Sequence, residues 1–369
     1  MSVREGEVDA AALRRARPVL VTGGAGFIGS NLVDRLCSAG HEVIVYDALV
    51  RPGVEANLAW LRRRHPRLVT PVVADLRDRA ALAEAAGRAG AVFHLAAQVA
   101  VTTSLDEPEH DFDVNLRATL HLLEALRRRA EPVPVVFAST NKVYGNLADV
   151  ALERDGDAYL PRDEGLRAHG IGEDRPLAFY TPYGCSKGAA DQYVLDYAHT
   201  YGLPACVLRM SCIYGPRQLG TEDQGWLAHF LFSVLAGHPI SIYGDGRQVR
   251  DVLYVDDAVD AYVAAWHRIG AVSGRAFNLG GGPANAVTLR HVLAEIGEIT
   301  GQRAELRFSD WRPGDQRYFV ADTRRAAEAL GLGPALPWRE GLRRLARWAA
   351  TSRRGASSQG RAVAGGGVA

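Results

Sequence analysis

The chain has 369 residues, 47% of them apolar, which is enough to fill the core of one large domain with a smaller lobe, or of two domains. Its formal net charge is +1 and its basic residues are dispersed, so we expect neither nucleic acid nor a membrane surface as a partner. The four cysteines show no CxxC spacing and no disulfide-scaffold density, which favours reduced thiols and a cytoplasmic protein.

The two ends of the chain show neither a folding pattern nor a targeting signal. The segment before Pro18 has no uninterrupted apolar run, and no later segment offers about 18 consecutive apolar residues, so we predict neither secretion nor a membrane span. The last stretch, SSQGRAVAGGGVA, is small, polar and glycine-rich. We therefore expect residues 1–17 and 352–369 to be flexible termini.

Between Pro18 and Tyr214, short apolar runs alternate with segments of helical period. The six runs are VLVTGG, HEVIVYD, LVTPVVADL, AVFHLAA, VPVVFAST and PACVLRMSCIYG. Apolar runs bounded by Gly and Asp are typical of strands that are buried on both faces of a parallel sheet. Six successive βα units predict an α/β fold with a doubly wound parallel sheet.

After Tyr214 the pattern changes to a loop-rich stretch, GPRQLGTEDQGWLAHF, with a helix behind it. RDVLYV is typical of a strand and DDAVDAYVAAW of a helix, and a further helix begins near Thr288 after AFNLGG. We predict a sheet domain, residues 18–214 plus 250–278, and a smaller discontinuous α/β lobe, residues 215–249 plus 279–350. Because ligands of open α/β sheets bind beyond the carboxyl ends of the strands, we expect the lobe to close over that edge.

The first strand-to-helix turn carries a dinucleotide-binding pattern. TGGAGFIG places Gly23, Gly26 and Gly29 so that the first permits a tight turn, the second lets the backbone approach a diphosphate, and the third lets helix and strand pack closely. The next strand, VIVYD, ends at Asp47, whose carboxylate can accept hydrogen bonds from both ribose hydroxyls of adenosine and would repel a 2′-phosphate. The pattern therefore favours NAD over NADP, with a turn-forming role as the alternative for Asp47.

Two further residues follow later strands. Asp75, after VVA, either forms a turn or contacts the adenine ring. His94 lies at the apolar end of the strand in FHLAA, which favours a packed histidine over a ligand. The histidines form no pattern typical of a metal site, so we expect no metal.

A tyrosine and a lysine stand four residues apart in TPYGCSKGAADQYV, at the start of a predicted helix. Residues at this spacing share one helix face, so Lys187 can hold its ammonium near the Tyr183 hydroxyl. A nearby cation lowers the pKa of a phenol, which makes the tyrosine a usable base. FASTNKVYG adds Ser139 and Thr140 at the end of the preceding strand, as hydroxyl donors for the same substrate oxygen.

In chain order, TGGAGFIG, HLAA, Asn115 in DVNLRAT, STNKVYG, YGCSK and RDVLYVDD resemble the extended short-chain dehydrogenase/reductase family of nucleotide-sugar epimerases and dehydratases, from about Pro18 to about Arg347. The resemblance implies a Rossmann-type NAD-binding domain and a nucleotide-sugar-binding lobe. It also implies that Thr140 polarises the reacting hydroxyl, that Tyr183 removes its proton, and that Lys187 holds the nicotinamide ribose.

The resemblance also implies two sets of binding residues. The expected NAD contacts are Gly23, Gly26, Phe27, Ile28, Gly29, Asp47, Asp75, Leu76, Leu95, Ala96, Ala97, Asn115, Ser139 and Lys187. The expected substrate contacts are Thr140, Asn141, Cys212, Arg217, Gln218, Gln224, Arg250 and Arg312. Arg250 and Arg312 are expected to clamp the substrate diphosphate, since guanidinium groups bind it in a bidentate manner, with a surface ion pair as the alternative.

Two residues argue against a dehydratase. Dehydratases of this family resemble the pattern Ser-Thr-Asp-Glu before Val-Tyr-Gly, where the acidic pair serves to eliminate water. Here the two positions are Asn141 and Lys142, and neither an amide nor a solvated ammonium replaces those carboxylates. Oxidation of a sugar alcohol followed by return of the hydride to the opposite face remains feasible, which predicts an epimerase.

A closer resemblance indicates the substrate. STNKVYG, DRPLAFYTPYGCSKGAADQYVLDYA and CIYGPRQLGTEDQGWLAHF resemble the CDP-tyvelose (CDP-paratose) 2-epimerase subgroup, which implies inversion at carbon 2 of a CDP-hexose. Cys212 stands where many relatives have an asparagine that contacts the substrate, so the identities of the sugar and of the nucleotide base stay open. An epimerase that acts at carbon 4 of a UDP-sugar or another nucleotide-sugar is the alternative, and a non-catalytic NAD-binding sensor or scaffold is a third possibility.

Self-association is the last expectation. Relatives of the family pair through helices that correspond to residues 110–129 and 183–201, so we expect a homo-oligomer, a dimer or a tetramer. Leu116, Leu120 and Leu123 recur at helical spacing in the first of these segments, although burial within one chain explains them equally well.

Overall fold

The computed structural model describes residues 17–364, and residues 1–16 and 365–369 lie outside the described part. Within it, the largest sheet has seven strands, all paired in parallel. Their spatial order is β12 (Ala276–Leu279), β8 (Ala205–Met210), β5 (Val135–Thr140), β4 (Ala91–His94), β1 (Val19–Thr22), β2 (Val43–Asp47) and β3 (Val69–Val73). The chain order reverses between β1 and β4, which is where a doubly wound sheet opens a crevice for ligands.

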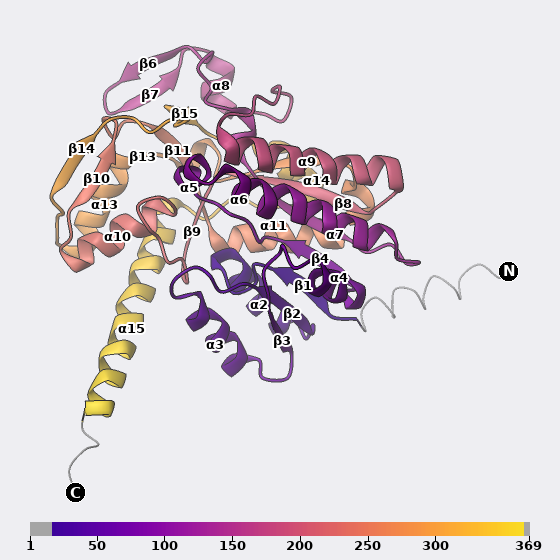
Figure 1. Ribbon diagram of the computed structural model, residues 1–369. Helices are drawn as coiled ribbons and strands as arrows, with labels where there is room; N and C mark the ends of the chain where they lie inside the picture. The colour runs from indigo at the N-terminus through magenta and orange to yellow at the C-terminus, as the bar shows by residue number, and fades with distance from the viewer. Residues whose placement is uncertain (1–16, 365–369) are drawn as a thin grey trace, which may run out of the picture.

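Helices cover both faces of this sheet (Figure 1). One face packs α2 (Phe27–Ser38), α3 (Val54–Arg64) and α11 (Val255–His267), and the other packs α4 (Arg79–Arg88), α7 (Ala118–Arg127) and α9 (Thr181–Tyr201). Along β1, Val19 and Val21 join the first of these cores and Leu20 joins the second, because successive strand side chains point to opposite faces. The predicted doubly wound α/β fold is confirmed.

The sheet departs from the prediction at its edge beyond β5. The run PACVLRMSCIYG was expected to be one strand, but it breaks at Ser211, which donates a hydrogen bond to the Asp251 carbonyl oxygen at 3.1 Å. After that break, β9 (Cys212–Tyr214) leaves the main sheet and pairs with β11 (Val249–Tyr254). A seventh strand, β12, completes the main sheet beside β8.

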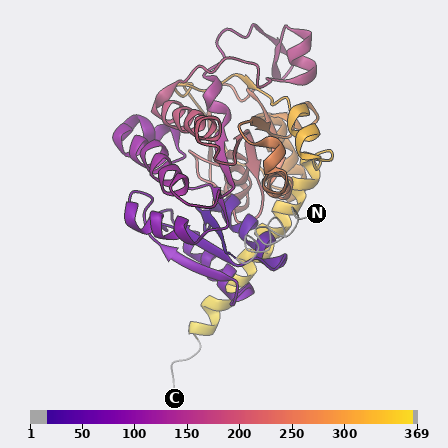
Figure 2. The same cartoon turned by 90° about the vertical axis from the view of Figure 1, so that its right-hand side faces the viewer.

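The smaller lobe is built around β11 and a separate pair of strands. In Figures 1 and 2 it lies beside the carboxyl edge of the main sheet. Its strands are β9, β11, β13 (Ala286–Thr288) and β15 (Tyr318–Phe319), with β10 (Ile240–Tyr243) pairing β14 (Leu306–Ser309). Its core packs α10 (Trp226–Ala236), α13 (Leu289–Thr300) and α15 (Trp338–Ala364).

The remaining described elements are short. They are α5 (Val101–Asp106), α6 (Pro108–Phe112), the π-helix η1 (Asp113–Arg117), the 3-10 helices η2 (Asn141–Tyr144) and η3 (Pro283–Asn285), β6 (Leu152–Asp155), β7 (Ala158–Pro161), α8 (Glu164–His169), α12 (Ile269–Val272) and α14 (Arg324–Leu330). The hairpin of β6 and β7 stands at the top of Figure 1, above β15.

Two boundaries differ from the expectation. Residues 250–254 were assigned to the sheet domain, but they form most of β11, which belongs to the lobe, while α11 and β12 do join the main sheet. The tail expected to be flexible from residue 352 continues α15 as far as Ala364. The rest of the tail, 365–369, and residues 1–16 lie outside the described part.

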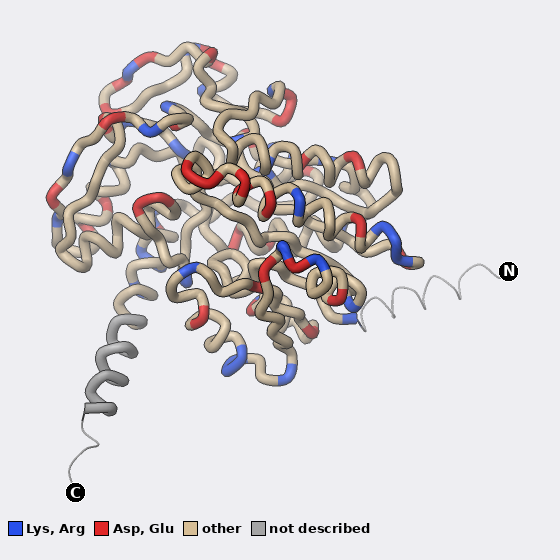
Figure 3. The backbone as a smooth tube through the Cα atoms, viewed as in Figure 1, with Lys and Arg blue, Asp and Glu red and all other residues tan. Residues whose placement is uncertain are grey.

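Figure 3 shows acidic and basic residues interspersed along the described chain. Among the described residues, no helix is both long and apolar enough to cross a membrane. All four cysteines are unpaired, as the sequence predicts.

Candidate active site

A cavity of about 780 Å³ lies at the carboxyl edge of the main sheet, between that sheet and the lobe. Most of the residues predicted to bind or react are gathered in its wall. They are Gly23, Gly26, Phe27, Ile28, Gly29, Asp47, Asp75, Leu76, Leu95, Ala96, Ala97, Ser139, Thr140, Asn141, Tyr183, Cys212, Gln218 and Gln224. Its volume falls within the range of about 300–1,000 Å³ that is usual for ligand sites.

The wall does not include five predicted residues, Asn115, Lys187, Arg217, Arg250 and Arg312. Asn115 is buried and exchanges two hydrogen bonds with the Gln98 backbone, so it fixes a segment of the wall without forming it. The Arg217 guanidinium lies 3.1 Å from the ring centroid of Trp60, on α3. Asn115 therefore holds a segment of the wall in place, whereas Arg217 packs on α3 outside the wall.

The turn between β1 and α2 fits a diphosphate. Gly23 has a φ of 69°, and a Cβ there would lie 2.8 Å from the Ala96 nitrogen. A Cβ on Gly26 would meet only the Gly23 oxygen, at 3.1 Å, so its other side is open towards the cavity. The first turn of α2 has no acidic residue and no side-chain cap, which leaves its backbone N–H groups available to an anion.

Asp47 and Asp75 have different surroundings. The Asp47 carboxylate accepts hydrogen bonds from the Ala25 and Leu49 backbone nitrogens at 3.0 and 2.9 Å, and it still faces the cavity. Asp75 is held by Arg77, whose side-chain hydrogen bonds lower the pKa of the carboxyl. The Arg77 backbone nitrogen also donates to Asp75 at 2.8 Å, so Asp75 forms a turn even though it lines the cavity.

His94 is a packed residue, as predicted. Its ring lies between the hydroxyls of Thr22 and Thr119, with nitrogen-to-oxygen distances of 2.7 and 3.0 Å. Burial lowers the pKa of His94 to about 3, so the ring is neutral near pH 7. The described residues contain no group of side chains that could hold a metal ion.

Tyr183 and Thr140 meet in the cavity wall. Burial raises the pKa of Tyr183 to about 12, against the effect of its hydrogen bond with the Thr140 hydroxyl. Lys187 is 3% exposed, its Nζ donates to the Ala138 carbonyl oxygen at 2.6 Å, and burial lowers its pKa to about 7. Desolvation of both groups dominates in this state, and the expectation that a charged Lys187 lowers the Tyr183 pKa stays a prediction.

Beneath these residues lies a buried ion pair that sequence reasoning missed. Arg209 on β8 contacts both carboxylate oxygens of Asp191 on α9 at 2.9 Å, and the exposed fractions of the two side chains are 5% and 0%. Ser139 donates to the same carboxylate at 2.7 Å. The pair locks α9 against β5 and β8, and the sequence gives no local sign of it because the three residues lie on separate elements.

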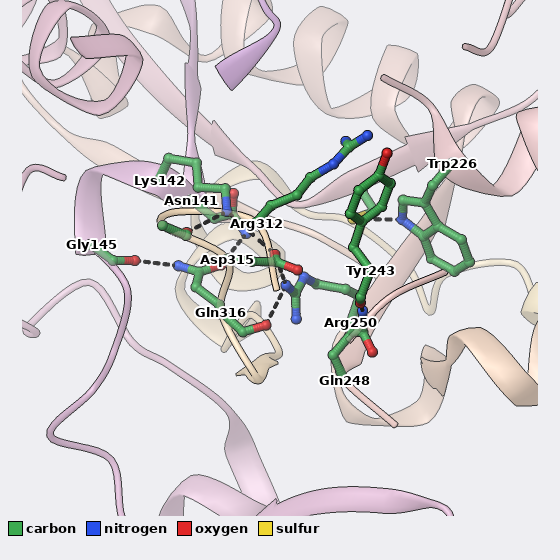
Figure 4. A network of polar contacts seen from close by, with 12 residues as sticks. Asn141, Lys142, Gly145, Trp226, Tyr243, Gln248, Arg250, Arg312, Asp315 and Gln316 are labelled. Carbon is green, nitrogen blue, oxygen red and sulfur yellow. Dashed lines mark hydrogen bonds and ion pairs between the residues drawn. The ribbon is translucent and has the colours of Figure 1, made fainter. Parts of the chain in front are cut away.

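Lys142 is not the solvated ammonium that the sequence implied. Its side chain is 22% exposed, and Nζ donates to the Gly314 carbonyl oxygen at 3.1 Å and lies 3.9 Å from Asp315 Oδ1 (Figure 4). Burial lowers the pKa of Lys142, and Asp315 opposes that change. Lys142 therefore joins the loop 310–317 of the lobe to the end of β5.

Arg250 and Arg312 are both engaged by acidic residues. Arg250 Nη2 contacts Asp315 at 2.7 Å and also donates to the Gln316 carbonyl oxygen (Figure 4). Arg312 forms an ion pair with Asp223 at 3.1 Å, and its guanidinium lies 3.8 Å from the Tyr243 ring centroid. These contacts are compatible with both expected roles of the two arginines, diphosphate binding and ion pairing.

Two glutamines present acceptors to the cavity. Gln218 is 8% exposed and donates through Nε2 to the Ile213 carbonyl oxygen at 3.1 Å, which fixes the orientation of its amide. Its Oε1 and that of Gln224 are buried without a hydrogen-bond partner. Nearby, Trp226 Nε1 contacts Cys212 Sγ at 3.4 Å. Buried acceptors of this kind favour a ligand that carries several hydrogen-bond donors.

The sequence profile of the NAD dependent epimerase/dehydratase family matches residues 19–280. The chain belongs to this family. Its cofactor is therefore NAD, and the predicted family, fold and kind of enzyme, an NAD-dependent nucleotide-sugar epimerase, are confirmed at this level. The open turn at Gly26, the uncapped start of α2 and the Asp47 carboxylate suit the diphosphate and the adenosine ribose of NAD.

The chain is similar to named proteins over most of its length. It is 37% identical to CDP-paratose 2-epimerase of Salmonella typhi, over 89% of this chain and 98% of that protein. UDP-glucose 4-epimerase of Thermotoga maritima with UDP-glucose has a TM-score of 0.77 at 32% identity, covering 91% of this chain and 99% of that one. The Thermus thermophilus UDP-glucose 4-epimerase complex with NAD has a TM-score of 0.74 at 33% identity, covering 90% and 98%.

Proposed function

We propose that the chain inverts carbon 2 of a CDP-hexose by transient oxidation to a keto-sugar and reduction from the opposite face. The observation that carries the proposal is the 37% identity to CDP-paratose 2-epimerase over 89% of the chain. The contact between Thr140 and Tyr183 in the cavity wall supports it. Bound NAD would accept the hydride from the sugar carbon and return it to the same carbon.

We assign the proton transfers to residues at the end of β5 and the start of α9. Tyr183 removes the proton of the reacting hydroxyl and gives it back, and Thr140 donates a hydrogen bond to the same oxygen. Lys187 holds the nicotinamide ribose and, when charged, stabilises the Tyr183 phenolate. Their burial supports these roles, since proton transfer gains most from groups held in a dry and fixed geometry.

The surroundings of Lys142 favour an epimerase over a dehydratase. Elimination of water needs an acid and a base beside the sugar, and Asn141 and Lys142 occupy the two positions. The Lys142 ammonium is directed to the Gly314 carbonyl oxygen and towards Asp315. A lysine held in this way does not replace the carboxylates that serve as acid and base in a dehydratase.

Carbon 2 is the proposed centre because of the similarity to CDP-paratose 2-epimerase, and direct oxidation at that carbon is the more economical route to its inversion. A ketone at carbon 4 would not acidify the hydrogen at carbon 2, since the two carbons are not adjacent. The unpartnered acceptors of Gln218 and Gln224 support a ligand rich in hydroxyl groups. A UDP-sugar 4-epimerase with the same chemistry is the second candidate, favoured by the likeness to UDP-glucose 4-epimerase of Thermotoga maritima.

The domain roles follow from this function. The main sheet domain would bind NAD through the cavity-lining residues predicted for it, and the lobe would bind the nucleotide-sugar. We further propose a cytoplasmic homo-oligomer, a dimer or a tetramer. The exposed aromatic residues Phe112, Tyr193 and Tyr201 on α6 and α9 support self-association along these helices.

The test is incubation of the purified protein with CDP- and UDP-hexoses in deuterated water, with NMR detection of the inverted carbon. Internal return of the hydride predicts inversion at carbon 2 of a CDP-hexose without solvent deuterium at that carbon. Inversion at carbon 4 would favour the second candidate, and deuterium at the inverted centre would contradict hydride return. Tyr183→Phe should abolish turnover with NAD still bound, whereas a sensor or scaffold would show no turnover before the substitution either.

A further inference from the structure

The Thr140 hydroxyl is the first member of a chain of side-chain amides that reaches from the site into the lobe. Thr140 Oγ1 lies 3.4 Å from Asn141 Oδ1, and Asn141 Nδ2 lies 3.4 Å from Gln316 Oε1. Gln316 Nε2 donates to the Gly145 carbonyl oxygen at 2.7 Å (Figure 4). We name this set, Thr140, Asn141, Gln316 and the Gly145 carbonyl, the amide relay.

The far end of the relay fixes the direction of every hydrogen bond in it. A carbonyl oxygen only accepts, so the Gln316 side chain must turn its NH₂ group to Gly145 and its oxygen to Asn141. Asn141 must then turn its NH₂ group to Gln316 and its oxygen to Thr140. Gln316 is fully buried and Asn141 is 8% exposed, so neither amide reverses without leaving a buried polar group unpaired.

The anchor of the relay is rigid. Gly145 has a φ of 72°, and a Cβ there would lie 2.3 Å from the Ala178 oxygen, so its backbone is confined by the segment opposite. Arg250 donates to the backbone oxygen of Gln316 and pairs with Asp315, which holds the other side of the loop. The relay is therefore fixed at Thr140, at the end of β5, and at the Gly145 carbonyl, directly after η2.

These constraints decide where the single hydrogen of Thr140 lies. A threonine hydroxyl has one hydrogen and two lone pairs. One lone pair accepts from the Lys142 backbone nitrogen at 3.2 Å, and the hydrogen points to Asn141. The hydrogen bond between Thr140 and Tyr183 lowers the pKa of Tyr183, so this contact stabilises the phenolate, to which Thr140 can donate its hydrogen.

We propose that Asn141 and Gln316 are positioning residues that hold the Thr140 hydrogen away from Tyr183 until the phenolate or the sugar oxyanion forms and draws that hydrogen to itself. The proposal rests on the proposed function for the reaction that forms this charge. The amide of Asn141 suits the task because it is a neutral acceptor at 3.4 Å and gives up the hydrogen to an anion. A carboxylate in its place would hold the hydrogen by a charge-assisted bond and would repel the phenolate.

The groups that face the relay carry charges of both signs. Lys142 and Asp315 flank Asn141, Arg250 contacts Gln316, and Lys142 interacts electrostatically with Cys212. These groups are present in the wild type as well as in any variant. Each variant is therefore compared with the wild type at every pH, and the ratio of the two kcat values is the readout.

The experiment uses two replacements that preserve shape, Asn141→Asp and Gln316→Glu, in the NAD-loaded protein. When ionised, each carboxylate loses the N–H donor of the amide and breaks the relay. When protonated, each carboxylic acid again offers one donor and one acceptor, like the amide. We expect kcat about tenfold below the wild type near pH 8, with KM changed less than about twofold, and a ratio that recovers towards one near pH 5.5, since burial raises the pKa of a carboxyl group.

Gln248→Glu is the matched control. Gln248 is 3% exposed and donates through Nε2 to the Tyr243 carbonyl oxygen at 2.9 Å, so it is a buried amide with a backbone acceptor outside the relay. Its kcat ratio to the wild type should not depend on pH. A flat ratio for Asn141→Asp, or the same pH recovery in Gln248→Glu, would overturn the relay.

A second measurement needs no substrate and separates the relay from the proposed function. The ultraviolet difference between each NAD-loaded protein and its Tyr183→Phe counterpart follows ionisation of the Tyr183 phenol. Asn141→Asp should raise the pKa of that phenol by about one unit, and Gln248→Glu should leave it unchanged. An unchanged pKa in Asn141→Asp would overturn the relay. Failure of the wild type to invert any nucleotide-sugar would overturn only the proposed function.

Discussion

Replacing Gly29 by alanine tests whether close packing of α2 on the first turn sets the NAD site. A Cβ on Gly29 would lie 2.0 Å from the Gly23 oxygen and 2.8 Å from both the Gly23 carbonyl carbon and the Gly24 Cα. All three atoms belong to the backbone, so no side-chain rotation relieves the clash. The closest contact would have to lengthen from 2.0 Å to at least 3.4 Å, which separates α2 from the turn.

We expect Gly29→Ala to lower the free energy of unfolding by about 1–3 kcal/mol, as overpacking of a fixed site does. NAD affinity should fall at least about tenfold, or about 1.4 kcal/mol, because the displaced turn no longer presents its N–H groups to the diphosphate. Urea denaturation and calorimetric titration with NAD measure the two effects.

Gly87→Ala provides the control, since Gly87 is an exposed helical glycine of α4 with no heavy atom within 4 Å of a Cβ built there. That substitution should leave NAD affinity unchanged and raise the free energy of unfolding by about 0.4–1 kcal/mol. The reasoning would be refuted if Gly29→Ala unfolded at the urea concentration of the wild type and bound NAD equally well.

Three further predictions concern the other parts of the site. Asp191→Asn should cost about 3–5 kcal/mol of unfolding free energy in urea denaturation, because it leaves the buried Arg209 charge unpaired, and a loss below about 1 kcal/mol would contradict this. The pKa of Lys187 is lowered from 10.5 to about 7, so the unfolded chain binds more protons than the folded protein between these two pH values. The free energy of unfolding should therefore rise with pH in this range. Lys187→Met should flatten that rise in urea denaturation measured at a series of pH values. Gln218→Leu should lower kcat/KM about tenfold at unchanged NAD affinity, because the substrate loses a buried acceptor, and equal kcat/KM values would disprove the contact.

The parts of the site that the sequence predicts depend on local backbone chemistry. The three glycines of TGGAGFIG act within one turn, and their spacing is visible without knowledge of the rest of the fold. Central apolar runs of the main sheet, such as β1 and β5, are buried on both faces and predict strands from composition alone, whereas the edge strand β3 is largely exposed. Tyr183 and Lys187 share a helix, which fixes their spacing and places both on the buried side of α9.

The parts that the sequence does not predict depend on long-range packing. From the sequence alone, Lys142 is expected to be solvated. In the fold it is covered by the loop at Gly314, which lies far along the chain. The sequence also gives no sign that Asp315, far along the chain, pairs with Arg250. The sequence pattern also cannot give the Tyr183 pKa, because the desolvation that raises it comes from the surrounding core rather than from Lys187.

The loop 310–317 connects substrate binding to proton transfer through neighbouring residues. Arg312 in this loop pairs with Asp223 of the cavity wall, while Asp315 pairs with Arg250. Gln316, the next residue, carries the amide that orients Asn141 and, through it, Thr140. A ligand that draws either arginine away from its carboxylate therefore acts on the backbone that also holds the amide relay. Because these contacts share one short loop, occupation of the lobe and the direction of the Thr140 hydroxyl are not independent in this fold.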